Sequence, residues 1–433
     1  MMLFYNLLFL SGMIAGLPLL IFLVLLSPKR RKTVLPRLGL TRLPVRNPQL
    51  GQNRRIWIHA LSLGEVMSAL PLVKALEQHF PQAEICFSAS TQTGFETAMR
   101  EISDHVSSVF HFPYDLIFSV KHVISHIDPD IAVIVETDIW PNFLMEMKKQ
   151  QIPVFLVNTR LSRKSFAAYK KFSFFTKPLF QTFAKICPQS QADALRFQHL
   201  GVHPDQIVIT GNMKFDQAVT IPDEHRIRQM RENLGIGSDR KIMIAGSTHE
   251  GEEVILSNVY SRLKREVPDL CLITAPRNPD RASDVCRIFT QQGHFARKMA
   301  DAEKNPSVFS DVIAVDRIGV LKDLYALADI AFVGGSLVPL GGHNPLEPAA
   351  FAKPVLFGQH MSDFAAISEM LLEAVAAVQV TDEQSFYKAG LDFLRSQNRA
   401  CAAGKQGQRV FCENRGAVAR TVEMLRPYLN CRI

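Results

Sequence analysis

The sequence lacks the short motifs that identify many nucleotide-dependent and metal-dependent enzymes. It contains no Walker loop, no zinc-ligand spacing, no Ser-His-Asp elbow and no GxGxxG segment between a strand and a helix. A DxD-type metal site is also missing, because the DPD segment at 128–130 precedes a predicted strand instead of ending one. We therefore expect no metal and no cofactor, and we expect phosphate charge to be met by helix N-termini and basic side chains.

Cysteine pairs are missing as well. The seven cysteines are scattered, none has CxxC spacing, and most lie in apolar stretches such as EICFSAS and LCLITAP. We expect reduced thiols in the core, which is typical of a reducing compartment. No tandem repeat or low-complexity segment is present, and a chain of 433 residues predicts two folded domains.

Acidic residues are absent from one strongly basic segment, Ser27–Arg55. The segment holds nine basic residues while the whole chain has a net charge of +8, so the remainder carries about −1 (8 − 9). Directly before it lies a run of about 20 residues without a charge, Leu7–Leu26, which is the length of a membrane-spanning helix. A basic segment beside an apolar run predicts binding to an anionic membrane surface and not to nucleic acid.

The charge-free run itself predicts a transmembrane helix. A cleaved signal peptide is the alternative, but no Lys or Arg precedes the run, and LLSPKRRK after it offers no small-residue cleavage site. The positive-inside rule places the basic residues that follow the run in the cytoplasm. We therefore expect a single-pass protein with cytoplasmic folded domains.

Beyond residue 53, apolar runs of strand length alternate with helical stretches, which predicts an α/β fold with parallel sheets and crossover helices. Two series of such runs occur: RIWIHA, EICFSAS, VSSVFHFP, DIAVIVE and PVFLVN, then IVITGN, KIMIAGS, LCLITAPR, DVIAV, IAFVGGS, PVLFG and AAVQV. The predicted parts are a membrane anchor (1–28), a basic connector (29–53), an N-terminal Rossmann-like domain (54–210) and a C-terminal one (211–433). The last helix is a candidate to pack back on the N-terminal domain. Ligands in such sheets bind beyond the carboxyl ends of the strands.

Three polar side chains follow strands of the first series. Glu65, in HALSLGEV, falls in the first turn of a helix, where it either favours the helix dipole by ~0.3–1 kcal/mol or acts as a general base in an interdomain cleft. His59 in the same segment is interpreted as a packed or hydrogen-bonding residue. Glu136, in ETDIWPN, is interpreted as a structural support, and Arg160, in NTRLS, meets either Glu136 or an anionic ligand.

The second series carries candidate phosphate and nucleotide ligands. Ser247, in GSTHEGEE, lies at a helix start, where a capping role and a phosphate contact are both open. Arg277, in PRNPDR, is either a phosphate ligand or a solvated arginine. In GGSLVPLGGHNPLEPA, two glycine pairs flank a helix start that carries Asn344 and Glu347. We interpret this segment as a nucleotide site, with free amides facing an anion and Glu347 accepting hydrogen bonds from ribose hydroxyls.

Taken together and in this order, HALSLGE, ETDIWPN, NTRLS, GNMKFD, GSTHEGEE and GGSLVPLGGHNPLEPA closely resemble the bacterial 3-deoxy-D-manno-octulosonic acid (Kdo) transferases. The resemblance covers nearly the whole chain. It implies a GT-B fold, in which two Rossmann-like domains flank a cleft. It also implies inverting transfer of Kdo from CMP-Kdo to the lipid A precursor (lipid IVA), in lipopolysaccharide core biosynthesis at the bacterial inner membrane.

The resemblance also assigns roles to residues. It implies that Glu65 is the catalytic base and Glu136 its bracing acid. It implies donor contacts at Lys214, Ser247, Arg277, Asn344 and Glu347, with the Gly319 loop and the Gly334–Gly335 turn lining the pocket. Two departures from the family pattern occur: Asn278 and Asp280 stand in a segment that usually reads PRHPER, and Val320 stands in one that usually reads GEL. These departures bear on how the enzyme recognises the cytosine base of the donor more than on the transfer reaction.

Two other functional classes share these features. Nucleotide-sugar epimerases use the same two-domain scaffold and similar nucleotide loops, but they need no lipid anchor. A non-catalytic lipid-binding or nucleotide-binding homologue would tolerate Asn278 and Val320. Only a transferase forms a Kdo-lipid product, so a product assay separates the three classes.

Overall fold

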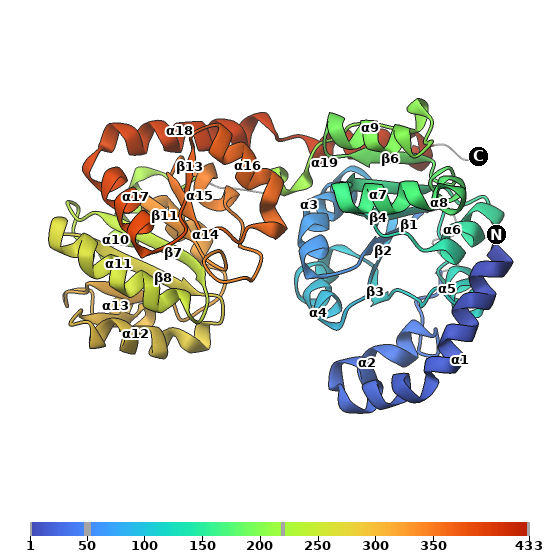
Figure 1. Cartoon of the computed structure of the whole chain (residues 1–433), viewed down its shortest axis with the longest axis horizontal. Coiled ribbons are helices and arrows are strands. Elements are labelled where there is room, and N and C mark those ends of the chain that lie inside the picture. Colours follow the sequence, from blue (N-terminus) through green and yellow to red (C-terminus); the bar gives the residue numbers. More distant parts are fainter. Residues whose placement is uncertain (1, 47–52, 218–220, 431–433) are drawn as a thin grey trace. The chain divides into compact units, whose positions relative to one another are not determined.

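The computed structural model describes residues 2–46, 53–217 and 221–430, and the chain divides into two compact α/β units. Unit 1 comprises Met1–Ala218 together with Asn414–Ile433, and unit 2 comprises Val219–Glu413. Each unit is a parallel sheet with helices on both faces (Figure 1). The α/β class with two parallel sheets therefore agrees with the prediction from the sequence.

The sheet of unit 1 has six strands in the order β3-β2-β1-β4-β5-β6, and neighbouring strands pair in parallel. Its strands are β1 (Arg55–Ala60), β2 (Glu84–Ala89), β3 (Ser108–His111), β4 (Ile131–Val135), β5 (Val154–Thr159) and β6 (Lys185–Pro188). Its helices are α1 (Met2–Leu26), α2 (Pro28–Arg37), α3 (Leu63–His79), α4 (Gln92–Glu101), α5 (Ile117–Ile127), α6 (Pro141–Lys149), α7 (Arg163–Lys171), α8 (Ser173–Phe180), α9 (Gln191–His199) and α19 (Ala417–Asn430).

The sheet of unit 2 has seven parallel strands in the order β13-β12-β11-β7-β8-β10-β9. They are β7 (Ile242–Thr248), β8 (Cys271–Pro276), β9 (Ala296–Lys298), β10 (Val312–Ala314), β11 (Ile330–Val333), β12 (Val355–Phe357) and β13 (Ala377–Gln379). Its helices are α10 (Glu224–Asn233), α11 (Glu252–Glu266), α12 (Ala282–Gln291), α13 (Met299–Lys304), α14 (Leu321–Leu324), α15 (Leu346–Ala350), α16 (Ala365–Glu373), α17 (Glu383–Arg395) and α18 (Gln397–Glu413).

The central strands are buried along their whole length, because helices cover both faces of each sheet. This explains why they appear in the sequence as continuous apolar runs. One expected strand, IVITGN, is absent from both sheets: only Ile207 forms an isolated bridge, to Ile186. Two short strands, β6 and β9, had no clear apolar run to indicate them.

The cysteines only partly follow the expectation of core thiols. All six in the described part of the chain are free, and Cys86, Cys187 and Cys271 are buried. Cys401 and Cys412, however, are exposed on α18, so the prediction was wrong for these two. Cys431 lies outside the described residues.

The division between the units differs from the predicted boundary at residue 211. Residues 211–217, which include GNMKFD, belong to unit 1, and so does α19. Helix α19 buries Val422 and Leu425 in the same core cluster as Val66 and Leu72 of α3. Its N-terminus is held by Asp216, whose carboxylate accepts hydrogen bonds from the backbone N–H groups of Gly416 and Val418, each at 2.6 Å. The last helix thus packs back on the N-terminal domain, as expected from the sequence.

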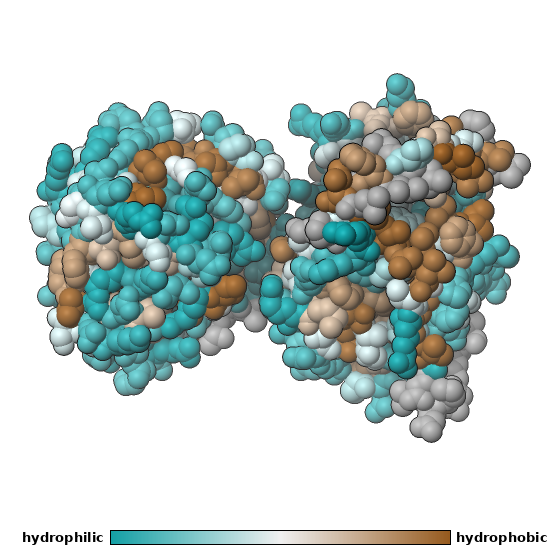
Figure 2. Space-filling model, turned by 90° about the horizontal axis from the view of Figure 1, so that it is seen from below, coloured by the Kyte–Doolittle hydropathy of each residue, from teal (hydrophilic) through white to brown (hydrophobic). Residues whose placement is uncertain are grey.

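Helix α1 occupies the charge-free run. Among the residues that the structure describes, no helix is both long and apolar enough to cross a membrane, so the predicted transmembrane helix is not supported. The first turns of α1 instead form hydrogen bonds with the rest of unit 1. The Tyr5 hydroxyl donates to Asp115 at 2.9 Å, and the side-chain amides of Asn6 and Asn142 bond to each other. Apolar residues gather over the unit that carries α1 in the view of Figure 2, and those exposed on α1 are Leu7, Leu8, Leu10, Ile14, Phe22 and Leu26.

The basic segment is less available to a membrane than its composition indicated. Arg55 is fully buried and pairs with Glu84 at 2.7 Å, and Arg46 and Arg54 both pair with Asp130. Arg37 is half-buried and donates to the Phe112 carbonyl. These four arginines are engaged within unit 1, and among the segment's side chains that the structure describes, Arg30, Arg31, Lys32 and Arg42 are the exposed basic ones.

We expect Asp216→Ala to lower the free energy of unfolding by ~1–3 kcal/mol, because two backbone donors at the start of α19 lose their acceptor. Urea unfolding followed by circular dichroism measures the change. Glu423→Ala is the matched control, because Glu423 lies exposed on the same helix and pairs only with Arg426. An Asp216→Ala midpoint equal to that of the control would contradict a role of this carboxylate in holding α19.

Candidate active site

Glu65 follows β1 directly and lies in the first turn of α3. Its carboxylate accepts the backbone N–H of Leu61, in a very short hydrogen bond, and that of Ser62 at 3.1 Å. This is the return half of a capping box, in which the side chain of the third helical residue satisfies backbone donors ahead of the helix. The capping role raised from the sequence is therefore present.

The electrostatics of Glu65 go beyond what a cap requires. The pKa of its carboxyl is raised to about 7, first by burial and then by the neighbouring charges of Glu136 and Asp138, against the two backbone hydrogen bonds that lower it. A helix-capping carboxylate exposed to solvent would not have its pKa raised in this way. The group therefore exchanges a proton near neutral pH, which is the property required of a general base.

Glu136 reaches Glu65 because β4 lies beside β1 in the sheet. It ends β4 with a positive φ of 63°, and its N–H donates to the Val157 carbonyl at 2.8 Å. Among the described residues no ion pair joins Glu136 to Arg160, whose side chain is exposed. The Arg160 backbone carbonyl instead accepts the Thr137 hydroxyl at 2.7 Å. Of the two alternatives for Arg160, the pairing with Glu136 is thus not formed.

His59 is buried within β1 and has partners on both ring nitrogens. Its Nε2 lies 3.0 Å from Asp138, its Nδ1 lies 3.0 Å from the Ser88 hydroxyl, and its ring stacks on Phe112. These contacts match the interpretation of His59 as a packed, hydrogen-bonding residue. They also hold the Asp138 carboxylate near Glu65.

Lys214 also belongs to unit 1. It lies half-buried in a short 3-10 helix (Met213–Asp216), and its backbone N–H donates to the Asn212 side chain at 3.0 Å. Met213 in turn donates to Asn158 at the end of β5. GNMKFD is therefore built around backbone contacts at the carboxyl edge of the unit 1 sheet.

In unit 2, the other predicted site residues gather at one edge of the sheet. Ser247 is the penultimate residue of β7, Arg277 follows β8, Gly319 follows β10 and the Gly334–Gly335 turn follows β11. These four strands are consecutive in the order β11-β7-β8-β10, so their carboxyl ends are adjacent. The tertiary structure thus brings together residues spread over much of the C-terminal half.

The glycines at this edge are needed for close backbone approach. A Cβ on Gly334 would lie 2.5 Å from the Ser247 carbonyl oxygen, and one on Gly246 would lie 2.0 Å from the Tyr325 hydroxyl. Ser247 itself has a positive φ of 55°. The loops after β7 and β11 are therefore packed against each other and cannot take larger side chains.

A buried carboxylate that the sequence did not single out fills this turn. Glu252 is fully buried and accepts the backbone N–H groups of Gly335, Ser336 and Leu337, at 2.7, 2.9 and 2.8 Å, in addition to that of His249. These amides of the Gly335 turn are therefore not available to a phosphate. The sequence around Ser247 indicates helix capping by its acidic run. Only tertiary contacts show that Glu252 is the carboxylate of this run that bonds to the amides of the Gly335 turn.

Two arginines follow β8, and the structure separates their roles. Arg281 pairs with Glu250 at 3.1 Å and with the buried Glu253 in a very short ion pair. Arg277 is exposed and has no ion-pair partner among the described residues, while its charge lowers the pKa of His249, His343 and Glu347. Arg277 is thus the arginine that is available to an anionic ligand.

Asn344 and Glu347 lie around the start of α15. The Asn344 side chain accepts the N–H of Leu346 at 3.1 Å, so one amide that was expected to face an anion is already used. Helix α15 is also only five residues long. Burial raises the pKa of Glu347, while the charges of Lys322 and Arg277 lower it. Glu347 therefore lies among positive charges at the edge that carries the other predicted ligands.

A pair of imidazoles joins the loops after β7 and β11. His249 and His343 stack with their ring planes 4° apart, and their Nε2 atoms are 2.8 Å apart, so one donates a proton to the other. Burial lowers the pKa of His343 to about 4, helped by the charges of His249 and Arg277. Among the described residues no group of three or more His, Cys, Asp and Glu side chains is placed to hold a metal ion.

The two departures from the family pattern have structural roles of their own. The Asn278 side chain accepts the N–H of Asp280 at 3.2 Å and so caps the short turn after β8. Val320 packs against the core of unit 2.

Comparison with known proteins identifies the family. Residues 32–217 match the family model described as 3-deoxy-D-manno-octulosonic-acid transferase (kdotransferase). The chain is 34% identical over 407 residues to the 3-deoxy-D-manno-octulosonic acid transferase of Haemophilus influenzae, with 93% of each chain covered. It is 28% identical to that of Chlamydophila psittaci, with 99% of this chain and 96% of the relative covered.

Solved structures show the fold alone. The UDP-GlcNAc 2-epimerase of Neisseria meningitidis, bound to UDP-GlcNAc, has a TM-score of 0.59 and 13% identity, with 86% of this chain and 100% of that chain covered. That likeness agrees with two Rossmann-like units of the GT-B kind. The identity to the Haemophilus influenzae protein over 93% of both chains is what decides the family. The chain belongs to the 3-deoxy-D-manno-octulosonic acid (Kdo) transferase family of glycosyltransferases.

Proposed function

We propose that this chain transfers Kdo from CMP-Kdo to a hydroxyl of the lipid A precursor, with inversion at the anomeric carbon. The observation that carries the proposal is the Glu65 carboxyl at the end of β1, whose pKa is raised to about 7 by burial and by Glu136. Family membership supports Kdo as the transferred group, since the relatives are named for Kdo transfer.

In the proposed reaction the Glu65 carboxylate takes the proton of the acceptor hydroxyl as its oxygen attacks the anomeric carbon of Kdo. The bond between that carbon and the phosphate oxygen of CMP breaks on the opposite face, and CMP leaves with the bonding electron pair. One displacement inverts the configuration. Glu136 acts on Glu65 through its charge, because it keeps the proton affinity of the base high.

The donor is held by unit 2 in this proposal. Arg277 pairs with the phosphate, Ser247 and the Gly319 loop line the nucleotide, and Glu347 and Asn344 face the ribose. Because Glu252 occupies the amides of the Gly335 turn, that turn supports the site without binding phosphate itself. We propose that Lys214 binds the carboxylate or phosphate of the donor and that no metal or other cofactor takes part.

The acceptor is an anionic lipid, and we propose that the enzyme works at the cytoplasmic face of the bacterial inner membrane. Exposed apolar side chains of α1 and the exposed Arg30, Arg31, Lys32 and Arg42 support attachment to such a surface. The anchoring charge is smaller than the whole 27–55 segment indicated, because its other described arginines are engaged in unit 1.

Purified protein incubated with CMP-Kdo and lipid IVA is expected to give a lipid heavier by one or more Kdo residues, measured by mass spectrometry. Epimerisation of a nucleotide sugar without a lipid product would favour the epimerase alternative. Binding of CMP without any turnover would favour a non-catalytic homologue.

Glu65→Gln is expected to lower kcat in this assay by ~10²–10⁴-fold, because an amide cannot accept the proton of the acceptor hydroxyl. The affinity for CMP, measured by calorimetry, should stay unchanged. Glu77→Gln is the control, since Glu77 is exposed on the same helix. A Glu65→Gln enzyme that turns over at the rate of the control would remove Glu65 from the role of base.

The rate is also expected to depend on pH near neutrality. The base must be ionised, and its pKa is raised to about 7, so kcat/KM should rise with pH through about 7 and level off above. Glu136→Gln removes a neighbouring negative charge, which lowers the pKa of Glu65 and moves the rising limb to lower pH. If kcat/KM rises at the same pH in the wild type and in Glu136→Gln, Glu136 does not act on Glu65 through its charge.

Arg277→Ala is expected to raise the Kd for CMP by ~10–100-fold, because a charge-assisted hydrogen bond is worth ~1.5–3 kcal/mol. Calorimetry with CMP measures this. Arg287→Ala serves as the control, since Arg287 is exposed on α12 and pairs with Asp284. Equal affinities in the two variants would exclude Arg277 from the phosphate site.

A further inference from the structure

One side of α1 is exposed and apolar along the helix. The half-buried residues, which face the rest of unit 1, include Tyr5, Asn6, Phe9, Met13 and Gly16. Because successive helical residues are turned by about 100°, the exposed apolar residues fall on the opposite side. They are 50–66% exposed, and we call them the α1 stripe: Leu7, Leu8, Leu10, Ile14, Phe22 and Leu26. Exposed apolar surface of this kind indicates contact with a membrane or with another protein.

Exposed cations follow the α1 stripe directly. Helix α1 has no charged residue, and α2 begins with Arg30, Arg31 and Lys32 exposed in its first turns. Apolar side chains beside cations complement a bilayer of anionic lipids, in which phosphate groups cover the acyl chains. A second copy of the chain is a less suitable partner, because it would bring the same cations, and residues 2–37 contain no acidic group.

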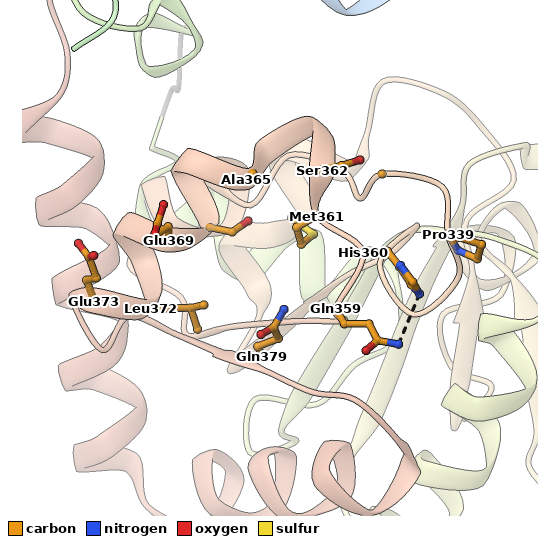
Figure 3. A pocket seen from close by; sticks show the side chains of 12 residues that line it. Pro339, Gln359, His360, Met361, Ser362, Ala365, Glu369, Leu372, Glu373 and Gln379 are labelled. Atoms are coloured by element: carbon orange, nitrogen blue, oxygen red, sulfur yellow. Dashed lines mark hydrogen bonds between the residues drawn. The ribbon is translucent and has the colours of Figure 1, made fainter. Parts of the chain in front are cut away.

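A cavity of about 640 Å³ in unit 2 has the opposite character. Glu369 and Glu373, one turn apart on α16, line it, and none of its described lining residues is a lysine or arginine (Figure 3). The two carboxylates would repel the phosphate group of a lipid. Of these two surfaces, the α1 stripe is therefore the one that fits an anionic membrane.

The start of α1 is fixed to the loop between β3 and α5. Asp115 in this loop is only 2% exposed, and its carboxylate accepts the Tyr5 hydroxyl at 2.9 Å. The same carboxylate accepts the backbone N–H groups of Asn142 and Phe143 at 3.0 Å each. The Tyr5 ring also lies against Phe175 of α8, with ring centres 5.7 Å apart. A buried carboxylate that caps α6 therefore also holds the start of α1.

The same loop holds the far end of α2. The chain bends at Ser27, whose backbone is extended, and α2 runs from there to Arg37 (Figure 1). The Arg37 carbonyl accepts the N–H of Tyr114 at 2.8 Å, and the Arg37 guanidinium lies 4.2 Å from the centre of the Tyr114 ring. Since Tyr114 precedes Asp115, Tyr5 and Arg37 are fixed to adjacent residues of one loop.

These two attachments limit where α1 can lie in a bilayer. Helix α1 has 25 residues and is about 37 Å long, while the hydrocarbon core of a bilayer is about 30 Å thick. Helix α2 has 10 residues and spans only about 15 Å. The end of α1 is thus tied, over about half the thickness of the core, to the loop that holds its start. A crossing helix would have its ends on opposite faces of the bilayer, which this short connection does not allow.

We propose that α1 lies in the plane of the membrane at its cytoplasmic face, with the α1 stripe among the acyl chains and both helix ends on the cytoplasmic side. The proposal rests on the membrane attachment given under the proposed function, and it adds the orientation of the helix. Arg30, Arg31 and Lys32 then face the phosphate groups of anionic lipids. Interfacial helices bind membranes in this way, by an apolar side and flanking cations.

The side of the membrane on which residue 2 lies tests the orientation. Met2→Cys is added to a full-length parent that carries Cys401→Ser and Cys412→Ser, and a membrane-impermeant maleimide is applied to spheroplasts and to inverted inner-membrane vesicles. We expect labelling above the parent in inverted vesicles only, because an in-plane α1 leaves residue 2 on the cytoplasmic side. The unchanged chain is the control for sidedness, since its Cys401 and Cys412 are exposed on α18. Labelling in spheroplasts, or none above the parent in inverted vesicles, would overturn the proposal.

Vesicle binding tests the α1 stripe itself. Ile14→Glu should weaken binding of the full chain to vesicles of phosphatidylethanolamine and phosphatidylglycerol by ~10-fold or more, because it places a charge among the acyl chains. Leu195→Glu is the matched control, since Leu195 is an exposed apolar residue of α9 in the same unit. Equal binding by the two variants, or no binding by the unchanged chain, would contradict the proposal. Self-association that Ile14→Glu abolishes, without vesicle binding, would assign the α1 stripe to a second copy instead.

Failure of the proposed function is a separate result. Neither labelling nor vesicle binding requires turnover, whereas loss of the proposed function appears as an absence of Kdo-lipid product in the wild-type assay.

Discussion

The parallel direction of the strands is the constraint on which the candidate site depends. When all strands of a sheet run the same way, their carboxyl ends share one edge, and a residue after one strand lies beside residues after the neighbouring strands. Glu65 and Glu136 meet because β1 and β4 are paired, although about seventy residues separate them in the chain. In unit 2, Ser247, Arg277 and Gly334 lie at one edge of the sheet for the same reason.

This proximity changes the chemistry of the groups that it brings together. Glu65 would be an ordinary helix-capping carboxylate if it stood alone, since it bonds to the two backbone donors ahead of α3. Burial and two neighbouring carboxylates raise its pKa to about 7. One side chain therefore both caps a helix and exchanges a proton at neutral pH, and its two roles come from different parts of the structure.

In unit 2 a buried acid determines which groups remain for ligands. Glu252 uses three amides of the Gly335 turn, and Glu253 and Glu250 hold Arg281. Arg277 then stands as the exposed cation of this loop, next to Glu347 and the His249–His343 pair. The turn is thus held by Glu252, and Arg277 remains as the group available to an anion.

The sequence by itself determined the α/β class, most of the strands, the glycine turn, the place of Glu65 in the first turn of a helix and the family resemblance. These depend on local patterns: apolar runs, capping residues and glycines that occur within a few positions of one another. Only the tertiary structure decided that IVITGN adds no strand, that Arg55 is buried against Glu84, and that Glu252 fills the amides of the Gly335 turn. Each of these depends on a partner far away in the chain, and such partners are set by strand order and packing, which no local pattern contains.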